Sequence, residues 1–414
     1  MLTNIVVGAG QAGGRAAIAM RRAGFAGRIV LLGDEGALPY ERPPLSKEFL
    51  FSTDDLGLTH FYEPATLAAA EIDVVLGVSA EAIDLAAGRL SLSMGGTIPY
   101  DSLVLATGSR PRRLQMPGAE RARVLRTFRD AVALRSALLP GTRVVCIGAG
   151  VIGLEIASSA RARGCHVTIV DIAATVMSRT LHPGHASAIA DLHRRNGVEL
   201  VLESSVAEIS PEHVILTDGR RLLADVVVAG IGVERNTALA RDAGIVSRRG
   251  IITDASGLTT AEGIYAAGEV AEFLSLRLGT HTVLETWRHA QDHGALVGRV
   301  AAGNAETYEE VLWFWSDQHG VNLQFAGDTT GLAATRVVHR GEYGSSSFAS
   351  FHIDAHGTVI GAVGHNAGKD IAAALRLIRQ RIVISPELLA DVGVSIQRIV
   401  ADASKARPVI NALQ

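Results

Sequence analysis

Two stretches of this 414-residue sequence repeat one order of residues, and this repeat constrains the fold more than any other feature. Each stretch passes from an apolar β-like segment through G-x-G-x-x-G into an Ala-rich helical segment, a second β-like segment and an acid; the copies span residues 5–35 and 143–171. The glycines of such a unit allow a tight turn, close approach of a pyrophosphate, and close helix–strand packing. The helix N-terminus offers N–H groups to the phosphates. The duplication predicts two dinucleotide-binding units in one chain.

The first copy, which we call the first fingerprint (residues 8–13), is interpreted as the cradle of a flavin dinucleotide. Its strand, turn, helix and acid follow in the order that a dinucleotide site requires. We expect an acid after the second strand to accept a hydrogen bond from a ribose hydroxyl. The predicted contacts of this unit are Gly8, Gly10, Gln11, Ala12, Gly13, Asp34 and Glu35.

The second copy contains the second fingerprint (residues 148–153) and closes with Asp171. Asp171 is expected to accept from a free ribose 2′-hydroxyl and to repel a 2′-phosphate. Since no Arg or Lys follows until Arg179, the nucleotide predicted here is NAD rather than NADP. The predicted contacts are Gly148, Gly150, Val151, Ile152, Gly153, Asp171, Arg179 and Gly232.

Other segments between and after the fingerprints combine rigidity with polar residues. Three prolines at 39, 43 and 44 fix an extended loop that carries Arg42, Ser46 and Lys47. Apolar strands also end in Ala-Thr-Gly (106–108) and in Ala-Ala-Gly268-Glu269, which is followed by Glu285-Thr286-Trp287. From Val311 the pattern alternates over short runs, which predicts an antiparallel sheet with helices after it.

Composition narrows the class of protein. Lys and Arg total 39 against 42 Asp and Glu, for a net charge of −3, which gives no reason to expect nucleic acid as a partner. No apolar run approaches the roughly 20 residues of a membrane span, and the N-terminus has no features of a signal peptide. Cys146 and Cys165 are the only cysteines, too few for a disulfide framework. We therefore expect a cytoplasmic protein.

The motifs together resemble a known family. Both fingerprints, Pro-Tyr-Glu-Arg-Pro-Pro-Leu-Ser-Lys (39–47), Leu-Ala-Thr-Gly, Ala-Ala-Gly-Glu and Trp-Phe-Trp-Ser-Asp-Gln (313–318) occur in that order. This is similar to the FAD-dependent NADH:ferredoxin reductases of bacterial ring-hydroxylating dioxygenases and cytochromes P450, and the resemblance covers essentially the whole chain. Residues 173–179 and 314–328 look most like the reductases of phenylpropionate and biphenyl dioxygenase systems.

The resemblance implies an α/β fold like that of glutathione reductase, with two Rossmann-like dinucleotide-binding domains and a C-terminal α+β domain. Residues 1–111 and 240–310 would form the FAD-binding domain, 112–239 an inserted NAD-binding domain, and 311–414 the interface domain. FAD, bound non-covalently, would contact Arg42, Lys47, Val78, Ala106, Thr107, Gly108, Arg126, Gly268, Glu269, Glu285, Thr286 and Trp287. The family usually has Asp where this chain has Glu269, so the contact to the flavin's ribityl chain is expected to shift.

The same resemblance suggests which residues act in the chemistry. Glu155 lies two residues past the last glycine of the second fingerprint, at the start of a helix. In the wider fold such a Glu pairs with a Lys beside flavin N5, so we predict a Lys47–Glu155 pair. Trp315, or alternatively Trp313, is expected to lie on the electron exit towards a ferredoxin, with the other Trp in the core. Arginines 110, 112, 113, 336 and 340 could meet an acidic ferredoxin.

The cysteine and histidine positions argue against related classes of enzyme and against a metal site. No C-x-x-C is present and no Cys precedes residue 146, which argues against a dithiol reductase and a flavin-loop thiol. Cys146 is expected to be inert in a strand, and His182, His185 and His193 to be surface histidines without a metal. The predicted function is NADH:ferredoxin oxidoreductase with FAD, delivering single electrons to a [2Fe–2S] ferredoxin that feeds an oxygenase. Rubredoxin reductase, a peroxide-forming NADH oxidase and an NADH-responsive flavin signalling protein remain open.

Overall fold

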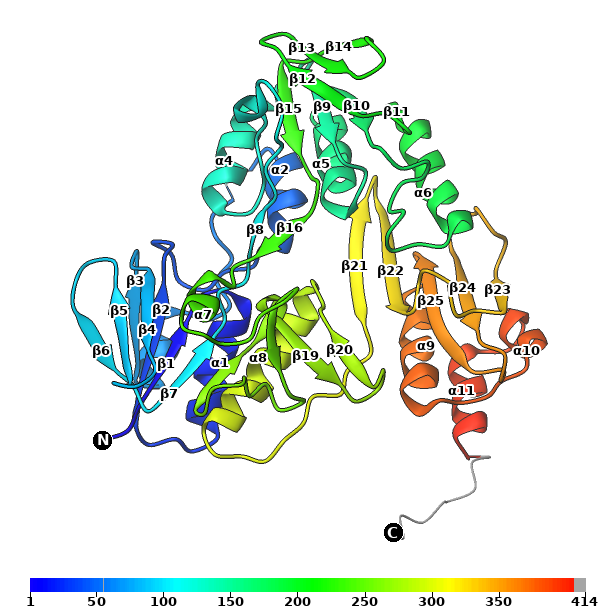
Figure 1. Ribbon diagram of the computed structural model, residues 1–414. Helices are drawn as coiled ribbons and strands as arrows, with labels where there is room; N and C mark the ends of the chain where they lie inside the picture. The colour runs from blue at the N-terminus through cyan, green and yellow to red at the C-terminus, as the bar shows by residue number, and fades with distance from the viewer. Residues whose placement is uncertain (55, 406–414) are drawn as a thin grey trace. The chain divides into compact units, whose positions relative to one another are not determined.

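The computed structural model describes residues 1–54 and 56–405, and the chain divides into two compact units (Figure 1). The first unit comprises Met1–Pro43, Asp54–Pro111 and Val233–Glu310. The second comprises Pro44–Thr53, Arg112–Gly232 and Val311–Gln414. The predicted division into four domain segments stays a prediction.

A five-stranded parallel sheet forms the centre of the first unit, in the order β18-β7-β1-β2-β3. Its strands are β1 (Thr3–Val7), β2 (Arg28–Gly33), β3 (Ile72–Leu76), β7 (Ser102–Leu105) and β18 (Ile264–Ala266). Alternate residues of these strands face two different cores. Val6 and Leu31 pack with helices α1 (Gln11–Arg22) and α8 (Trp287–Ala301), whereas Ile5 and Leu32 pack on the opposite face.

Helices α1 and α8 approach each other closely because two residues of α8 lack side chains. A Cβ on Gly294 would lie 2.4 Å from the carbonyl oxygen of Ala12, and one on Gly298 would lie 2.2 Å from that of Ala16. This contact fixes α1, whose N-terminus lies within the first fingerprint.

Smaller elements complete the first unit. The second face of the parallel sheet contacts the antiparallel sheet β4-β5-β6 and helix α7. The remaining bounds are α3 (Pro64–Ala69), β4 (Ala80–Asp84), β5 (Arg89–Leu92), β6 (Thr97–Pro99), β8 (Ser109–Pro111) paired with β16 (Val233–Arg235), α7 (Ala238–Asp242), β17 (Ile251–Thr253), η3 (Gly268–Val270), β19 (Ala271–Ser275) and β20 (Thr280–Thr282).

The second unit repeats the parallel arrangement in the sheet β11-β10-β9-β15. Its strands are β9 (Arg143–Ile147), β10 (His166–Val170), β11 (Val198–Val201) and β15 (Val226–Ala229). Around it lie η1 (Pro43–Ser46), α2 (Glu48–Phe51), η2 (Ala119–Arg121), α4 (Phe128–Ala137), α5 (Val151–Ala162), α6 (Pro183–Arg195), and the small sheet β12 (Val206–Ile209), β13 (His213–Leu216) and β14 (Arg221–Leu223).

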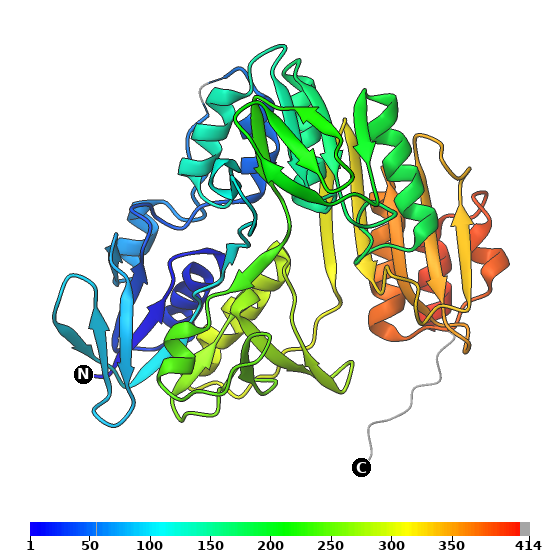
Figure 2. The same ribbon diagram turned by 45° about the horizontal axis from the view of Figure 1, so that its top comes forward.

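The C-terminal part of the second unit is an antiparallel sheet covered by helices (Figure 2). The sheet order is β21-β22-β25-β24-β23, with β21 (Trp313–Gln318), β22 (Val321–Gly327), β23 (Arg336–Arg340), β24 (Phe348–Ile353) and β25 (Val359–His365). Helices α9 (Gly368–Gln380), α10 (Pro386–Ala390) and α11 (Ile396–Lys405) share a hydrophobic core with it that includes Phe351 and Leu377. Of the helices formed by residues 1–54 and 56–405, none has the length and apolar character needed to cross a membrane.

Candidate functional site

The first fingerprint has the geometry of a phosphate cradle. Gly8 has φ +113°, and a Cβ there would lie 2.2 Å from the carbonyl oxygen of Ala106. A Cβ on Gly13 would lie 1.8 Å from the carbonyl oxygen of Gly8, so only glycine allows α1 to pack so closely on the turn. Gly10 is different, because a Cβ there would meet no described atom within 4 Å. No side chain caps the N-terminus of α1 at Gly10. Gly10 and its neighbours therefore have space and N–H groups for an anion.

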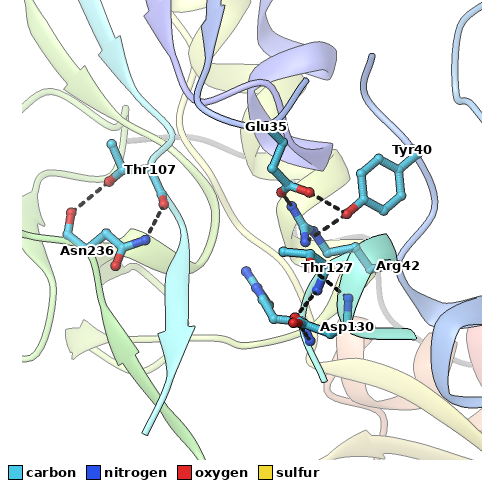
Figure 3. A network of polar contacts seen from close by, with 8 residues as sticks. Glu35, Tyr40, Arg42, Thr107, Thr127, Asp130 and Asn236 are labelled. Atoms are coloured by element: carbon cyan, nitrogen blue, oxygen red, sulfur yellow. Dashed lines mark hydrogen bonds and ion pairs between the residues drawn. The ribbon is translucent and has the colours of Figure 1, made fainter. Parts of the chain in front are cut away.

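The acid region after β2 contains a network of side chains (Figure 3). Glu35 accepts hydrogen bonds from the Tyr40 hydroxyl at 2.6 Å and from the Arg42 guanidinium. Burial lowers the pKa of Arg42, but the negative charges of Glu35, Tyr40 and Glu269 outweigh it and hold the pKa above its ordinary value. The backbone N–H of Val78 donates to the Gly33 carbonyl at 3.0 Å, so Val78 lies beside this strand end. Asp34 is exposed.

The Ala-Thr-Gly turn after β7 is tied to a residue that the motifs did not identify. The Thr107 hydroxyl donates to the carbonyl of Asn236 at 2.8 Å, and the Asn236 side chain donates back to the carbonyl of Thr107 at 2.8 Å (Figure 3). The backbone N–H of Asn236 also donates to Gly108. A lone Asn after a short strand carries no recognisable sequence signal, so this partner was missed.

The turn at Gly268-Glu269 is held by two buried histidines of α8. Gly268 donates its N–H to His293 Nδ1 at 3.2 Å and accepts from His289 Nε2 at 3.3 Å. Arg235 donates to the carbonyl of Glu269 at 2.8 Å and pairs with the Glu285 carboxylate at 2.6 Å. The backbone that carries the Glu269 side chain is thus fixed from several sides.

Thr286 and Trp287 form the start of α8. The Thr286 hydroxyl accepts from the backbone N–H of His289 at 3.1 Å, which caps the helix. The indole N–H of Trp287 donates to Glu41 at 2.6 Å. Burial raises the pKa of Glu41, partly offset by this bond and by the charge of Arg15. Glu41 was not among the predicted residues, although it lies within the Pro-rich loop.

The second fingerprint repeats the cradle within the second unit. Gly148 has φ +108°, and a Cβ on Gly153 would lie 2.0 Å from the carbonyl oxygen of Gly148. Val151 and Ile152 form the first turn of α5, and Gly150 leaves its N-terminus without a side-chain cap. Asp171, directly after β10, accepts from the backbone N–H of Ala149 at 2.6 Å and from that of Ala173 at 2.7 Å. These bonds hold its carboxylate next to the fingerprint.

Arg179 lies near the end of another strand of the same sheet. A Cβ on Gly232 would lie 3.4 Å from Arg179 Nη2. Gly232 follows β15, which pairs with β9 on the side opposite β10. The structure therefore brings Arg179 and Gly232 together.

A buried ion pair forms the polar centre of the second unit. Lys47 Nζ lies 3.0 Å from Glu155 Oε1, and their side chains are only 9% and 2% exposed. The Ser316 hydroxyl donates to the same Glu155 oxygen at 2.6 Å, and the Ser46 hydroxyl donates to the other. The pairing predicted for Lys47 and Glu155 is present, and Ser46 and Ser316 complete the surroundings of the carboxylate.

The tryptophans of β21 lie next to this pair. Lys47 Nζ is 5.7 Å from the centroid of the Trp315 ring, and Trp315 stacks on Trp313 with centroids 5.4 Å apart. Trp313 also packs against the hydrophobic core of the C-terminal sheet. The Trp315 ring thus contacts the polar centre.

Arg126 lies in the second unit, at the entrance to α4. Its backbone N–H donates to the Asp130 carboxylate at 3.1 Å, and Thr127 and Asp130 form a capping box (Figure 3). The predicted contact of Arg126 with FAD stays a prediction.

Two expectations from the sequence are wrong. His185 and His193 are buried, at 1% and 0% exposure, because α6 packs against the C-terminal sheet. Arg340 is also buried and donates to three backbone carbonyls after β25, so it does not meet a ferredoxin.

Cys146 is buried in β9 as expected, and burial raises its pKa to about 12. No three His, Cys, Asp or Glu side chains within residues 1–54 and 56–405 are arranged to hold a metal ion.

Models of two known families match most of the chain. The model described as pyridine nucleotide-disulphide oxidoreductase matches residues 3–294. The chain belongs to the pyridine nucleotide-disulphide oxidoreductase family. A second model, described as reductase C-terminal, matches residues 313–400. The chain is thus an oxidoreductase of this family. Unlike the disulphide in the family's description, its Cys146 and Cys165 are buried free thiols.

Individual relatives align over nearly the whole chain. The ferredoxin–NAD(+) reductase component of the p-cumate 2,3-dioxygenase system of Pseudomonas putida is 38% identical over 390 residues, covering 94% of this chain and 96% of the relative. The corresponding component of the anthranilate 1,2-dioxygenase system of Burkholderia cepacia is 38% identical over 399 residues, covering 95% and 98%. The crystal structure of the covalent putidaredoxin reductase–putidaredoxin complex matches with a TM-score of 0.93 at 32% identity, covering 98% of this chain and 99% of that one. The resemblance inferred from the motifs and the predicted fold class are confirmed.

Proposed function

We propose that this chain is a ferredoxin–NAD(+) reductase that oxidises NADH through bound FAD and reduces a [2Fe–2S] ferredoxin. That ferredoxin would feed an aromatic-ring dioxygenase or a cytochrome P450. The observation that carries the proposal is the end-to-end relationship to ferredoxin–NAD(+) reductase components of dioxygenase systems. The relative crystallised in a covalent complex with putidaredoxin supports a small electron-transfer protein as partner.

The first fingerprint fits the assignment of FAD. Gly10 leaves open space, and the uncapped N-terminus of α1 supplies N–H groups for a pyrophosphate. We assign FAD also to the residues predicted above on the Ala-Thr-Gly and Gly268-Glu269 turns, and to Lys47 and Arg126. When bound, FAD accepts a hydride from the nicotinamide and returns the electrons singly.

The second fingerprint supports NADH over NADPH. The Asp171 carboxylate is held by two backbone N–H groups next to the fingerprint, so it can accept from a ribose hydroxyl and repels a 2′-phosphate. The guanidinium of Arg179 lies by Gly232. We propose that Arg179 contacts the nucleotide elsewhere, at the end of β15.

We assign Lys47, Glu155 and Trp315 to the chemistry at the flavin. Glu155 fixes the Lys47 ammonium at 3.0 Å, and an ammonium fixed in this way stabilises negative charge that develops during hydride transfer. The Trp315 ring, in contact with Lys47, is our proposed exit for electrons towards the ferredoxin. A cytoplasmic location is proposed because NADH and reduced ferredoxins are cytoplasmic reagents.

The deciding experiment follows NADH oxidation by the purified protein with and without a [2Fe–2S] ferredoxin plus cytochrome c. NADPH and a rubredoxin run in parallel, and hydrogen peroxide is measured. We expect strong stimulation by the ferredoxin, with NADH well ahead of NADPH. Fast peroxide formation that no ferredoxin changes would identify an NADH oxidase. Slow NADH oxidation under every condition would favour a flavin signalling protein.

A further inference from the structure

A chain of hydrogen-bonded side chains leads from Glu155 through the second unit to the end of β21. Ser316 and Gln318 lie two residues apart on β21 and therefore face the same side of the strand. Gln318 Nε2 lies 2.9 Å from Ser316 Oγ, and Gln318 Oε1 lies 2.9 Å from Nε2 of His193 on α6. His193 Nδ1 lies 3.1 Å from His319 Nε2. We call Glu155, Ser316, Gln318, His193 and His319 the Glu155 chain.

The hydrogen bonds of the Glu155 chain all run in one direction. The Gln318 amide nitrogen donates to the Ser316 oxygen, so the single proton of the Ser316 hydroxyl points to Glu155 Oε1, 2.6 Å away. The Gln318 carbonyl oxygen can only accept, so His193 must carry its proton on Nε2. His193 Nδ1 is then free to accept from His319 Nε2–H.

The opposite direction keeps the other hydrogen bonds but loses the one to Glu155. If the Gln318 amide were turned over, its oxygen would accept from Ser316 and its nitrogen would donate to His193. His193 would then carry its proton on Nδ1, and Glu155 would lose the Ser316 donor. The protonation site of His193 and the donor on Glu155 are therefore linked. An amide does not readily pass a proton on, so the link acts through orientation rather than proton transfer.

Burial makes this link effective. Ser316, Gln318 and His193 are each 0% exposed, so water does not replace a missing partner. Burial also lowers the pKa of His193 to about 4, which keeps its ring neutral at pH 7 with one N–H to place.

We propose that His193 is a positioning residue: through Gln318 and Ser316 it sets a hydrogen-bond donor on Glu155 and so fixes the carboxylate that holds Lys47. Its effect on hydride transfer rests on the function proposed above. The direction of the Glu155 chain does not rest on that function and is measured separately.

The first test reads the protonation site of His193 in the full-length protein. Two-bond ¹H–¹⁵N spectra of ¹⁵N-histidine-labelled protein distinguish the two neutral forms of each ring. The His193 signals are assigned by their loss in His193→Gln. We expect the Nε2–H form for His193 at pH 7, and a shift towards the Nδ1–H form in Gln318→Leu, which has no acceptor for Nε2–H. A native His193 with its proton on Nδ1 would overturn the proposal.

The second test measures flavin reduction by NADH in anaerobic stopped-flow experiments. His193→Leu removes the N–H group that donates to Gln318. This change should slow flavin reduction by NADH about tenfold, the scale of one hydrogen bond to a charged group. His193→Gln, which can still donate to Gln318, should restore most of the rate. The matched control is His185→Leu, since His185 is equally buried on α6 but contacts His352 rather than the Glu155 chain.

The outcomes separate the two proposals. Equal slowing in the His193→Leu and His185→Leu variants, or no rescue by glutamine, would make His193 a packing residue and overturn the inference. Absence of flavin reduction by NADH in the unmodified protein would instead overturn the proposed function, and the protonation site of His193 would still decide the direction of the Glu155 chain.

Discussion

The two fingerprints are built alike as far as Leu32 and Val170 of their second strands and differ at the next position. Gly8 donates its N–H to the carbonyl of Leu32, and Gly148 donates to that of Val170, both over parallel strand pairs in the same register. Leu32 therefore corresponds to Val170, and the residue that corresponds to Asp171 is Gly33. In the second unit an acid follows the strand directly, whereas in the first a glycine takes this place.

Steric contact explains why the first unit has no acid at this position. A Cβ on Gly33 would lie 2.6 Å from the Cβ of Ala9. The acids are displaced to Asp34 and Glu35, and Glu35 is held by the side chains of Tyr40 and Arg42. Asp171, by contrast, is held by two backbone N–H groups. The same fingerprint pattern thus occurs with an acid fixed by backbone N–H groups in the second unit and with an acid fixed by side chains of the Pro-rich loop in the first.

The sharpest way to separate the two fingerprints is to add one methyl group to the last glycine of each. In Gly13→Ala and Gly153→Ala the new Cβ would lie 1.8 Å and 2.0 Å from a carbonyl oxygen, so helix and turn must separate. We expect Gly13→Ala to be purified without flavin. Gly153→Ala should remain yellow but be reduced by NADH at least about a hundredfold more slowly, which corresponds to about 2.8 kcal/mol. A colourless Gly153→Ala protein would show that the second fingerprint also supports flavin retention.

The second prediction concerns the acid fixed by the backbone. Asp171→Ala removes a charged acceptor for a ribose hydroxyl, and such bonds contribute about 1.5–3 kcal/mol. The value of kcat/KM for NADH should fall by about tenfold or more, while that for NADPH falls less or rises. The control is Glu208→Ala, which removes an exposed acid from the same unit. An unchanged ratio of NADH to NADPH activity would refute the role of Asp171.

The fingerprints and the parallel strands could be predicted from the sequence because their signals are local. The spacing of the glycines, the apolar strands and the order of the motifs all lie within short segments. The Lys47–Glu155 pair was predictable only through the family resemblance, since the two residues are far apart in the chain.

What the sequence did not reveal depends on packing between distant elements. Asn236 contacts Thr107 across 129 residues, and His193 contacts Gln318 across 125. His185 and His193 lie four residues before and after Ile189, so the helical spacing places them on the same apolar face of α6. The sheet that covers this face could not be foreseen, because it is formed by residues more than a hundred positions later. The exposed position expected for both was wrong for this reason.

The third prediction concerns the acid fixed by side chains. Arg42→Met leaves Glu35 without its guanidinium partner and should weaken FAD retention by about threefold to tenfold, as expected for a partly buried ion pair. Arg28→Met is the matched control, because Arg28 pairs with Asp73 on the surface at 48% and 53% exposure. Flavin release after dilution, followed by fluorescence, measures the effect. Equal release from both variants would mean that the Pro-rich loop does not fix the acid of the first fingerprint.

The smallest expected effect is at Glu269, where the family resemblance leads one to expect Asp. The backbone at this turn cannot move easily to compensate for the longer side chain, since Arg235 holds the carbonyl of Glu269 and the two histidines of α8 hold Gly268. Glu269→Asp should therefore withdraw the carboxylate by one methylene and slow flavin release by about twofold to threefold, the scale of an improved hydrogen bond.

Glu269→Gln separates charge from length in the same experiment. If the carboxylate contacts the flavin through its charge, Glu269→Gln should release flavin faster than the native protein while Glu269→Asp releases it more slowly. Faster release from Glu269→Asp would mean that the native glutamate already makes the contact, at a reach that aspartate lacks. In that case two acids of the first unit, Glu35 and Glu269, would contribute to flavin binding through the positions of their side chains. In the second unit, by contrast, backbone N–H groups fix the acid Asp171.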